Sequence, residues 1–127
     1  MDTIEKIKLR ICVYTCGTMR KIEYEAVSNG AIELTIFDNL SLFEDEDNSG
    51  KSLIKKEKQT LSKDEINSFF NAILSLLKKE ITIIPLLETK SILTIYYSTK
   101  GHKEILEDSN INECVEAFLQ TKFSLNN

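Results

Sequence analysis

The first part of the chain alternates between apolar and polar residues, which is the pattern of a β-strand with one buried face. The apolar face of the first predicted strand consists of Ile7, Leu9, Ile11 and Val13. Gly17 ends this segment, and the alternation returns over residues 21–26 and 31–37. The Asn-Gly pair at residues 29–30 favours a tight hairpin turn between these two segments. The pattern therefore predicts three antiparallel strands joined in chain order.

Three further segments have strand character. Residues 52–59 are rich in lysine and predict a fourth strand at the edge of the sheet, where lysines discourage further pairing. Residues 92–97 and 102–106 predict two more strands joined by a turn. The apolar segment 81–88 contains Pro85, which indicates an edge strand or a packed loop.

The spacing of apolar residues changes to that of a helix after Leu61. Ser62 and Glu65 form the pattern of a capping box, which predicts the start of the helix. Its apolar face consists of Ile66, Phe69, Phe70, Ile73, Leu74 and Leu77. Lys78 and Lys79 are expected in the last turn, where positive charge interacts favourably with the helix dipole.

A second helix is predicted over residues 110–122. Asn110, with Glu113 three residues later, is the expected N-cap. The apolar face of this helix is expected to consist of Ile111, Cys114, Val115, Phe118 and Leu119.

These elements predict an α+β fold made of a mainly antiparallel β-sheet with two amphipathic helices packed on one face. The expected order is β-β-β-(β)-α-(β)-β-β-α. The length of 127 residues fits a single globular domain, residues 1–127. An acidic surface loop is expected near residues 38–50 and a short flexible C-terminus at residues 124–127.

Composition narrows the classes of function. The net charge of −4 argues against a dedicated nucleic-acid-binding protein, which usually carries a basic excess. The N-terminus has no secretory signal pattern, and the most apolar stretch is too short to cross a bilayer. The three cysteines are an odd number and widely spaced, which is typical of reduced thiols. We therefore expect a cytoplasmic protein, and the many lysine, isoleucine and asparagine residues indicate a bacterial or phage origin.

The stretch DEDNSG resembles the first half of an EF-hand calcium loop. Asp45, Asp47, Ser49 and Gly50 occupy the first, third, fifth and sixth positions of such a loop. The twelfth position, which requires a bidentate glutamate, is Lys56. The flanking segments also lack the pattern of the two helices of an EF-hand. The resemblance is confined to half a loop, so no calcium site is predicted.

The rest of the sequence gives little support for a metal site or for a catalytic site. Cys12, Cys16, Cys114 and His102 would make a Cys3His zinc set, but residues four apart on a strand are too distant for one tetrahedral ion. The sequence contains no nucleophile elbow and no glycine-rich phosphate loop. We expect no cofactor and no enzymatic activity.

Among the features that do not predict secondary structure, the separation of acidic from basic residues is the strongest in the sequence. An acidic block is followed directly by the lysine-rich segment, and both together are either a solvated surface or a docking surface for a partner. The candidate partner-binding residues are Glu44, Asp45, Glu46, Asp47, Lys55, Lys56 and Lys58.

These observations favour a small non-enzymatic protein-interaction or inhibitor module of the immunity type, with a charged surface that binds another protein. The acidic block would imitate nucleic-acid phosphates for a toxin or nuclease. The alternative is a small-ligand or cation-binding domain with a site between the sheet and the helices. A third hypothesis is a homo-oligomer that buries exposed strands in a symmetric contact.

Overall fold

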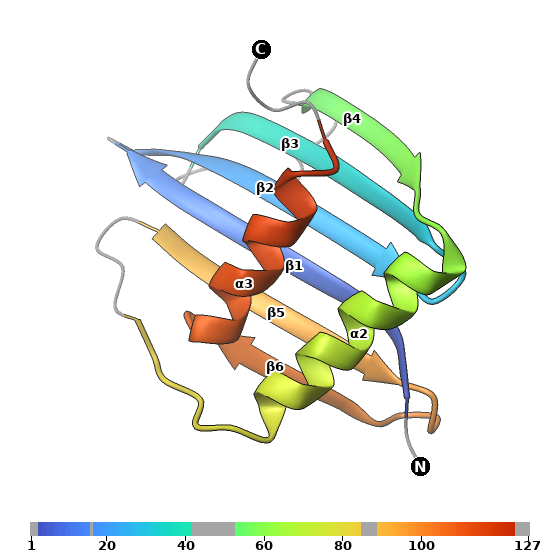
Figure 1. Cartoon of the computed structure of the whole chain (residues 1–127). Helices are drawn as coiled ribbons and strands as arrows, with labels where there is room; N and C mark the ends of the chain where they lie inside the picture. The colour runs from blue at the N-terminus through green and yellow to red at the C-terminus, as the bar shows by residue number, and fades with distance from the viewer. Residues whose placement is uncertain (1–2, 16, 42–52, 85–88, 124–127) are drawn as a thin grey trace.

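The computed structural model describes residues 3–15, 17–41, 53–84 and 89–123. In these ranges, one antiparallel sheet of six strands carries two helices on one face (Figure 1), which confirms the predicted α+β class. The strands lie in the order β4-β3-β2-β1-β5-β6. Their bounds are Ile4–Thr15 for β1, Thr18–Val27 for β2, Ala31–Ser41 for β3, Leu53–Thr60 for β4, Thr89–Tyr97 for β5 and Lys103–Glu107 for β6. Helix α2 spans Lys63–Leu77 and helix α3 spans Asn110–Gln120.

The first four strands form a meander. The alternation predicts the first three of them, and the lysine-rich composition predicts the fourth. The hairpin between β2 and β3 turns at Gly30, whose φ of 99° is in the region that favours glycine. Gly30 also lies against the end of β4, because Leu61 N donates a hydrogen bond of 2.8 Å to the Gly30 carbonyl. A Cβ atom on Gly30 would lie 2.3 Å from the Leu61 carbonyl oxygen. Backbone conformation and close packing therefore both require glycine here.

The predicted lysine-rich edge strand is confirmed as β4, which pairs with β3. Residues 42–52, which precede β4 in the sequence and include Glu44, Asp45, Glu46 and Asp47, lie outside the described residues. The C-terminal residues 124–127 also lie outside them. In the segment 81–88, Ile83 forms an isolated bridge with Ser109, and residues 85–88 are not described.

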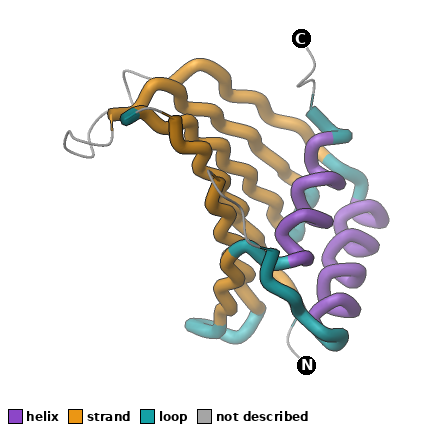
Figure 2. The backbone as a smooth tube through the Cα atoms, turned by 90° about the vertical axis from the view of Figure 1, so that its left-hand side faces the viewer, coloured by secondary structure: helices purple, strands orange, loops and turns teal. Residues whose placement is uncertain are grey.

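Both helices lie on the same side of the sheet (Figure 2). The core consists of the buried apolar side chains of the strands and of these helices. The strands contribute the residues that the alternation predicts, and α2 contributes Ile66, Phe69, Phe70 and Ile73. The two helices meet where Phe69 stacks on Phe118, with ring centroids 4.1 Å apart. The helices in the described ranges lack the length and apolar content needed to span a bilayer.

Helix α2 begins as predicted and ends earlier than predicted. Ser62 is the N-cap, and its hydroxyl accepts a hydrogen bond from the backbone of Glu65, whose carboxylate in turn accepts one from Ser62 N. The placement of Lys78 and Lys79 in the last turn is wrong, because Lys78 is already the C-cap. Its N–H bonds to carbonyls two and three residues back, which closes the helix at Leu77.

Helix α3 differs from the prediction at its cap and on one face. The N-cap is Ser109 rather than Asn110. The assignment of Cys114 to the apolar face is also wrong, since its side chain is exposed. Ile111, Val115 and Leu119 recur every four residues and face the sheet. Cys114 precedes Val115 by one residue, about 100° around the helix, and points away from the core.

A buried polar network fixes the start of α3 to the sheet. The side-chain amide of Asn112, only 1% exposed, donates to the Leu106 carbonyl at 3.0 Å and to the Ser91 hydroxyl at 3.1 Å. Its carbonyl oxygen accepts a hydrogen bond of 2.9 Å from the Ser109 hydroxyl. Asp108, with a φ of 50°, turns the chain so that its carboxylate accepts a bond of 2.7 Å from Ser91 N. The network connects α3 with both β5 and β6.

Candidate interaction surface

The face of the sheet opposite the helices is not covered by any described element (Figure 2), and we call it the open face. Successive strand residues point to opposite faces, so the residues between the buried ones lie here. Its cationic side chains are Lys6, Lys8, Arg10, Lys21, Lys56, Lys58, Lys90 and Lys103. Its carboxylates are Glu23, Glu25, Glu33 and Glu107. Cations outnumber carboxylates two to one on this face, although the whole chain has a net charge of −4.

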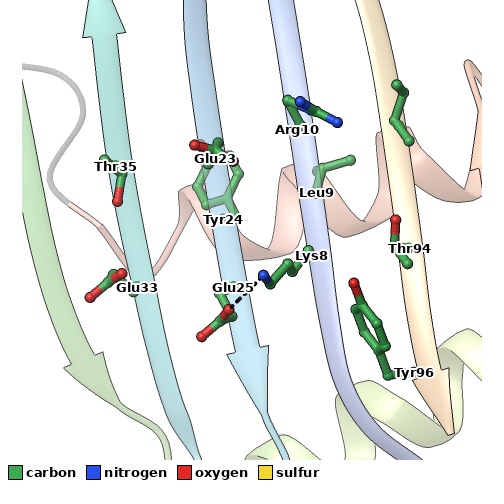
Figure 3. A pocket seen from close by; sticks show the side chains of 11 residues that line it. Lys8, Leu9, Arg10, Glu23, Tyr24, Glu25, Glu33, Thr35, Thr94 and Tyr96 are labelled. Carbon is green, nitrogen blue, oxygen red and sulfur yellow. Dashed lines mark ion pairs between the residues drawn. The ribbon is translucent and has the colours of Figure 1, made fainter. Parts of the chain in front are cut away.

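A shallow hollow of about 410 Å³ lies in the middle of the open face, across β3, β2, β1 and β5 (Figure 3). Lys8 and Glu25 face each other across it, with a nitrogen–oxygen distance of 3.7 Å. The other carboxylates of the open face also have lysine partners. These pairs are Lys58–Glu33 at 3.6 Å, Lys21–Glu23 at 3.8 Å and Lys90–Glu107 at 3.0 Å.

Four cations of the open face form no ion pair with another described residue: Lys6, Arg10, Lys56 and Lys103. The Lys6 ammonium lies over the Tyr96 ring, 4.7 Å from its centroid. Arg10 lies opposite Glu23 in the strand register, but its guanidinium reaches toward β5 (Figure 3). The excess positive charge is therefore concentrated on β1 and β6, which flank β5, apart from Lys56 on β4.

The open face consequently has two different halves. The half on β1, β5 and β6 combines unpaired cations with apolar side chains, and we call it the basic–apolar half: Lys6, Arg10, Ile92, Tyr96, Lys103 and Ile105. The half on β2, β3 and β4, which we call the paired half, contains Lys21, Glu23, Glu25, Glu33, Lys56 and Lys58. Ile105 is 55% exposed, so the basic–apolar half presents apolar surface to solvent.

Tyr14 and Cys12 lie on the open face near the end of β1. Burial raises the pKa of Tyr14, with a further contribution from Cys12, while Lys90 and Arg10 oppose the shift. The phenol therefore stays protonated at neutral pH and can donate a hydrogen bond.

The structure separates the predicted partner-binding lysines. Lys56 and Lys58 lie on the open face, opposite Thr35 and Glu33 of β3. Lys55 points to the other side of the sheet, where it pairs with Glu57 at 3.6 Å. The four predicted acidic residues, Glu44, Asp45, Glu46 and Asp47, lie outside the described residues.

Sequence reasoning did not identify the basic–apolar half. The signal was present in the polar residues of the first strand, since Lys8, Arg10, Cys12 and Tyr14 all fall on the face opposite the predicted core. Two helices on one face leave the other face of the sheet bare, so these polar positions define a surface. The cross-strand neighbours Ile92 and Ile105 could not be found this way, because the pairing of β1 with β5 spans about eighty residues.

The residues considered for zinc or thiol chemistry are dispersed. Cys12 is on the open face and Cys114 is in the helix layer, on opposite sides of the sheet. His102 is exposed, and its ring stacks on Tyr97 with centroids 4.4 Å apart. Cys16 lies outside the described residues. Within the described ranges, no group of three or more histidine, cysteine, aspartate or glutamate side chains is placed to hold a metal ion.

Apolar side chains fill the interior between sheet and helices. The hydroxyl of Tyr24 lies between β2 and α3. Among the buried side-chain nitrogen and oxygen atoms of the described residues, it alone has no hydrogen-bond partner. Burial raises the pKa of Tyr24 to about 12, the Glu116 carboxylate adds to the shift, and the nearby Gln120 side chain opposes it.

Comparison of the chain with protein-family models, with curated proteins and with solved structures gives no match. The functional conclusion therefore depends on the surface itself.

Proposed function

We propose that this chain is a non-enzymatic protein-interaction module that binds its partner through the open face of the sheet. The observation that carries the proposal is that the helices cover the sheet on one side only. On the other side, cations that form no ion pair with another described residue lie beside the exposed Ile105 and the half-buried Ile92.

Arg10 and Tyr96 of the basic–apolar half are residue types that are enriched at the centres of interfaces, and Lys6 and Lys103 are types found around such centres. Arginine, tyrosine and large apolar residues are enriched at protein–protein contacts, where their burial supplies most of the binding free energy. Burial of exposed apolar area stabilises a complex by roughly 25 cal/mol per Å² before the costs of association. Charged residues around such a centre increase the association rate and select the partner.

The sharpest form of the proposal is an inhibitor of the immunity type, and it depends on the acidic block in the sequence. Replacing Asp45 by Asn, Glu46 by Gln and Asp47 by Asn removes the charge of this block with little change in side-chain size. Loss of partner binding in a folded triple variant supports the inhibitor form. Retained affinity in this variant would refute it and leave the open face as the contact.

The proposed function is tested by co-purification from the native host, with mass spectrometry to identify bound proteins. The open-face variant is Arg10→Glu with Glu33→Lys, which changes both halves of the surface. The matched control is Lys63→Glu with Asp64→Lys, which changes exposed residues at the start of α2. A partner retained by the control and lost with the open-face variant supports the proposal. A partner bound equally by both variants would show that the contact lies elsewhere.

A small-ligand site between sheet and helices is the second candidate. The observation in its favour is the buried Tyr24 hydroxyl without a hydrogen-bond partner among the described residues, a group that a polar ligand atom would satisfy. A thermal-shift screen with calcium, zinc and common metabolites tests it, because a ligand specific for the folded state raises the unfolding midpoint. An unchanged midpoint across the screen would count against this candidate.

A further inference from the structure

We propose that the partner presents an acidic segment with apolar side chains, and that this segment binds along the basic–apolar half of the open face. The inference rests on the proposed function and adds the location of the contact and the chemistry of the partner. It follows from charge, from apolar exposure and from the shape of the surface.

Charge distinguishes the two halves. In the paired half, Glu23, Glu25 and Glu33 each lie within 4 Å of a lysine nitrogen. In the basic–apolar half, Lys6, Arg10 and Lys103 have no carboxylate of the described chain within that distance. A carboxylate-rich partner would neutralise these cations, whereas a basic partner would be repelled by them.

Apolar exposure coincides with this charge. Ile92 lies directly opposite Arg10 in the strand register. Ile105 lies one strand further away on β6, opposite Thr94 of β5. Tyr96 lies between Lys6 and Lys103 in the same way. A purely acidic, fully hydrated segment would leave this apolar area in water, so the partner segment must also contain apolar residues.

The shape of the surface fits an extended segment. A second hollow of about 540 Å³ meets the first hollow at Tyr96, and its charged lining residues are Lys6, Lys100, Lys103 and Glu5. Arg10 and Lys6 are four residues apart on one strand, a separation of about 13 Å. The part of the first hollow over β1 and β5 therefore continues past Tyr96 to the turn after β5, while the rest of that hollow extends over β2 and β3. An extended segment of about six residues spans the part over β1 and β5.

Single-stranded nucleic acid would also be attracted to the cations, but the aromatic side chains argue for a polypeptide. Bases bind such surfaces by stacking on exposed aromatic rings. The Lys6 ammonium lies over the Tyr96 ring and the Lys21 ammonium lies over the Phe37 ring, each 4.7 Å from the ring centroid. The lysines therefore occupy the ring faces on which bases would stack.

The inference is tested by nuclear magnetic resonance titration of the labelled protein with three probes: a hexapeptide of alternating acidic and apolar residues, the same peptide with lysines in place of the acidic residues, and an oligothymidylate. The acidic–apolar peptide is expected to shift backbone resonances of β1, β5 and β6. Shifts confined to β2–β4 or to the helices, or no shifts with this peptide, would overturn the inference. So would tighter binding of the oligothymidylate or the basic peptide.

Two matched variants locate the contact. Lys6→Glu with Arg10→Glu reverses two charges in the basic–apolar half, and Lys56→Glu with Lys58→Glu reverses two charges in the paired half. We expect the first variant to weaken peptide binding by about tenfold or more and the second by less than about threefold. Equal losses would refute the location. If the first variant does not give the spectrum of a folded protein, Lys6→Gln with Arg10→Gln replaces it. This variant is also expected to weaken peptide binding more than the Lys56 and Lys58 variant does.

The same pair of variants separates this inference from the proposed function. A native partner lost only with the Lys6 and Arg10 variant supports both proposals. A partner lost only with the Lys56 and Lys58 variant supports the proposed function and overturns this inference. A partner unaffected by either variant counts against both.

Discussion

Replacing Asn112 by alanine is expected to produce one of the largest destabilisations in this protein for a single side chain outside the apolar core. The change removes the amide that donates to the Leu106 carbonyl and to Ser91 and the oxygen that accepts from Ser109. All of these groups lie at the junction of α3 with β5 and β6. Because Asn112 is only 1% exposed, water reaches the abandoned groups only if the junction opens.

The size of the effect follows from the number of bonds. The bonds of 3.0 Å and 3.1 Å from the amide and of 2.9 Å to its oxygen have good geometry. Each contributes a net stabilisation of about 1 kcal/mol, and buried groups left without partners increase the cost. We therefore expect a loss of about 3 kcal/mol in the free energy of unfolding. For a chain of this length, that loss lowers the thermal midpoint by roughly 10 °C.

Urea and thermal unfolding followed by far-ultraviolet circular dichroism measure both quantities. Asn67→Ala is the matched control, because Asn67 is an exposed asparagine within α2 and its replacement is expected to change stability by less than about 0.5 kcal/mol. A loss below about 1 kcal/mol for Asn112→Ala would show that water or local rearrangement satisfies the network. The conclusion that the network fixes α3 to the sheet would then be wrong.

Three other changes have clear expected outcomes. Gly30→Ala is expected to lower the free energy of unfolding by at least about 2 kcal/mol, because Gly30 has a positive φ and an added Cβ would lie 2.3 Å from the Leu61 carbonyl oxygen. Gly101 has a φ of 81° and open space around it, so Gly101→Ala is expected to cost about 1 kcal/mol. Equal losses in urea unfolding would contradict the role of the close approach. Burial, followed by the nearby Glu113 carboxylate, raises the pKa of Glu116 above its ordinary value of 4.5. The Glu116 carboxylate thus binds a proton more readily in the folded protein than in the unfolded chain, so its charged form destabilises the fold at neutral pH. Glu116→Gln should therefore raise the thermal midpoint at neutral pH and have little effect well below the ordinary carboxyl pKa. The opposite pH dependence would show that the pKa of Glu116 is not raised in the folded protein. The exposed Cys114 thiol should react rapidly with Ellman's reagent in the folded protein, and Cys114→Ser should remove one fast equivalent without changing stability; an unchanged fast phase would place the reactive thiol elsewhere.

The sequence predicts the parts of the fold that depend on local periodicity and turn chemistry. The meander from β1 to β4 and the capping box of α2 agree with the structure because their signals lie within a few residues of each other. The class of fold follows, since two amphipathic helices can bury their apolar faces only against the same side of the sheet when the other side is polar.

The start of α3 shows where local signals are insufficient. Two overlapping cap patterns occur there, Ser109 with Asn112 and Asn110 with Glu113, each three residues apart. The structure uses the first because Asn112 also bonds to Ser91 and Leu106, which are distant in sequence or on another element. No periodicity carries this information. The basic–apolar half of the open face depends in the same way on the pairing of β1 with β5.

The central position of β1 has a consequence for synthesis of the chain. On one side β1 pairs with β2, which follows it directly, and on the other with β5, which begins at Thr89. While the ribosome makes the chain, the meander can therefore form long before β5 is available. During that interval the second edge of β1 has unpaired backbone groups beside the apolar residues Ile7, Leu9 and Ile11, a combination that recruits strands from other chains. A strand that is paired on both sides in the finished protein is thus open to misassembly in the nascent one.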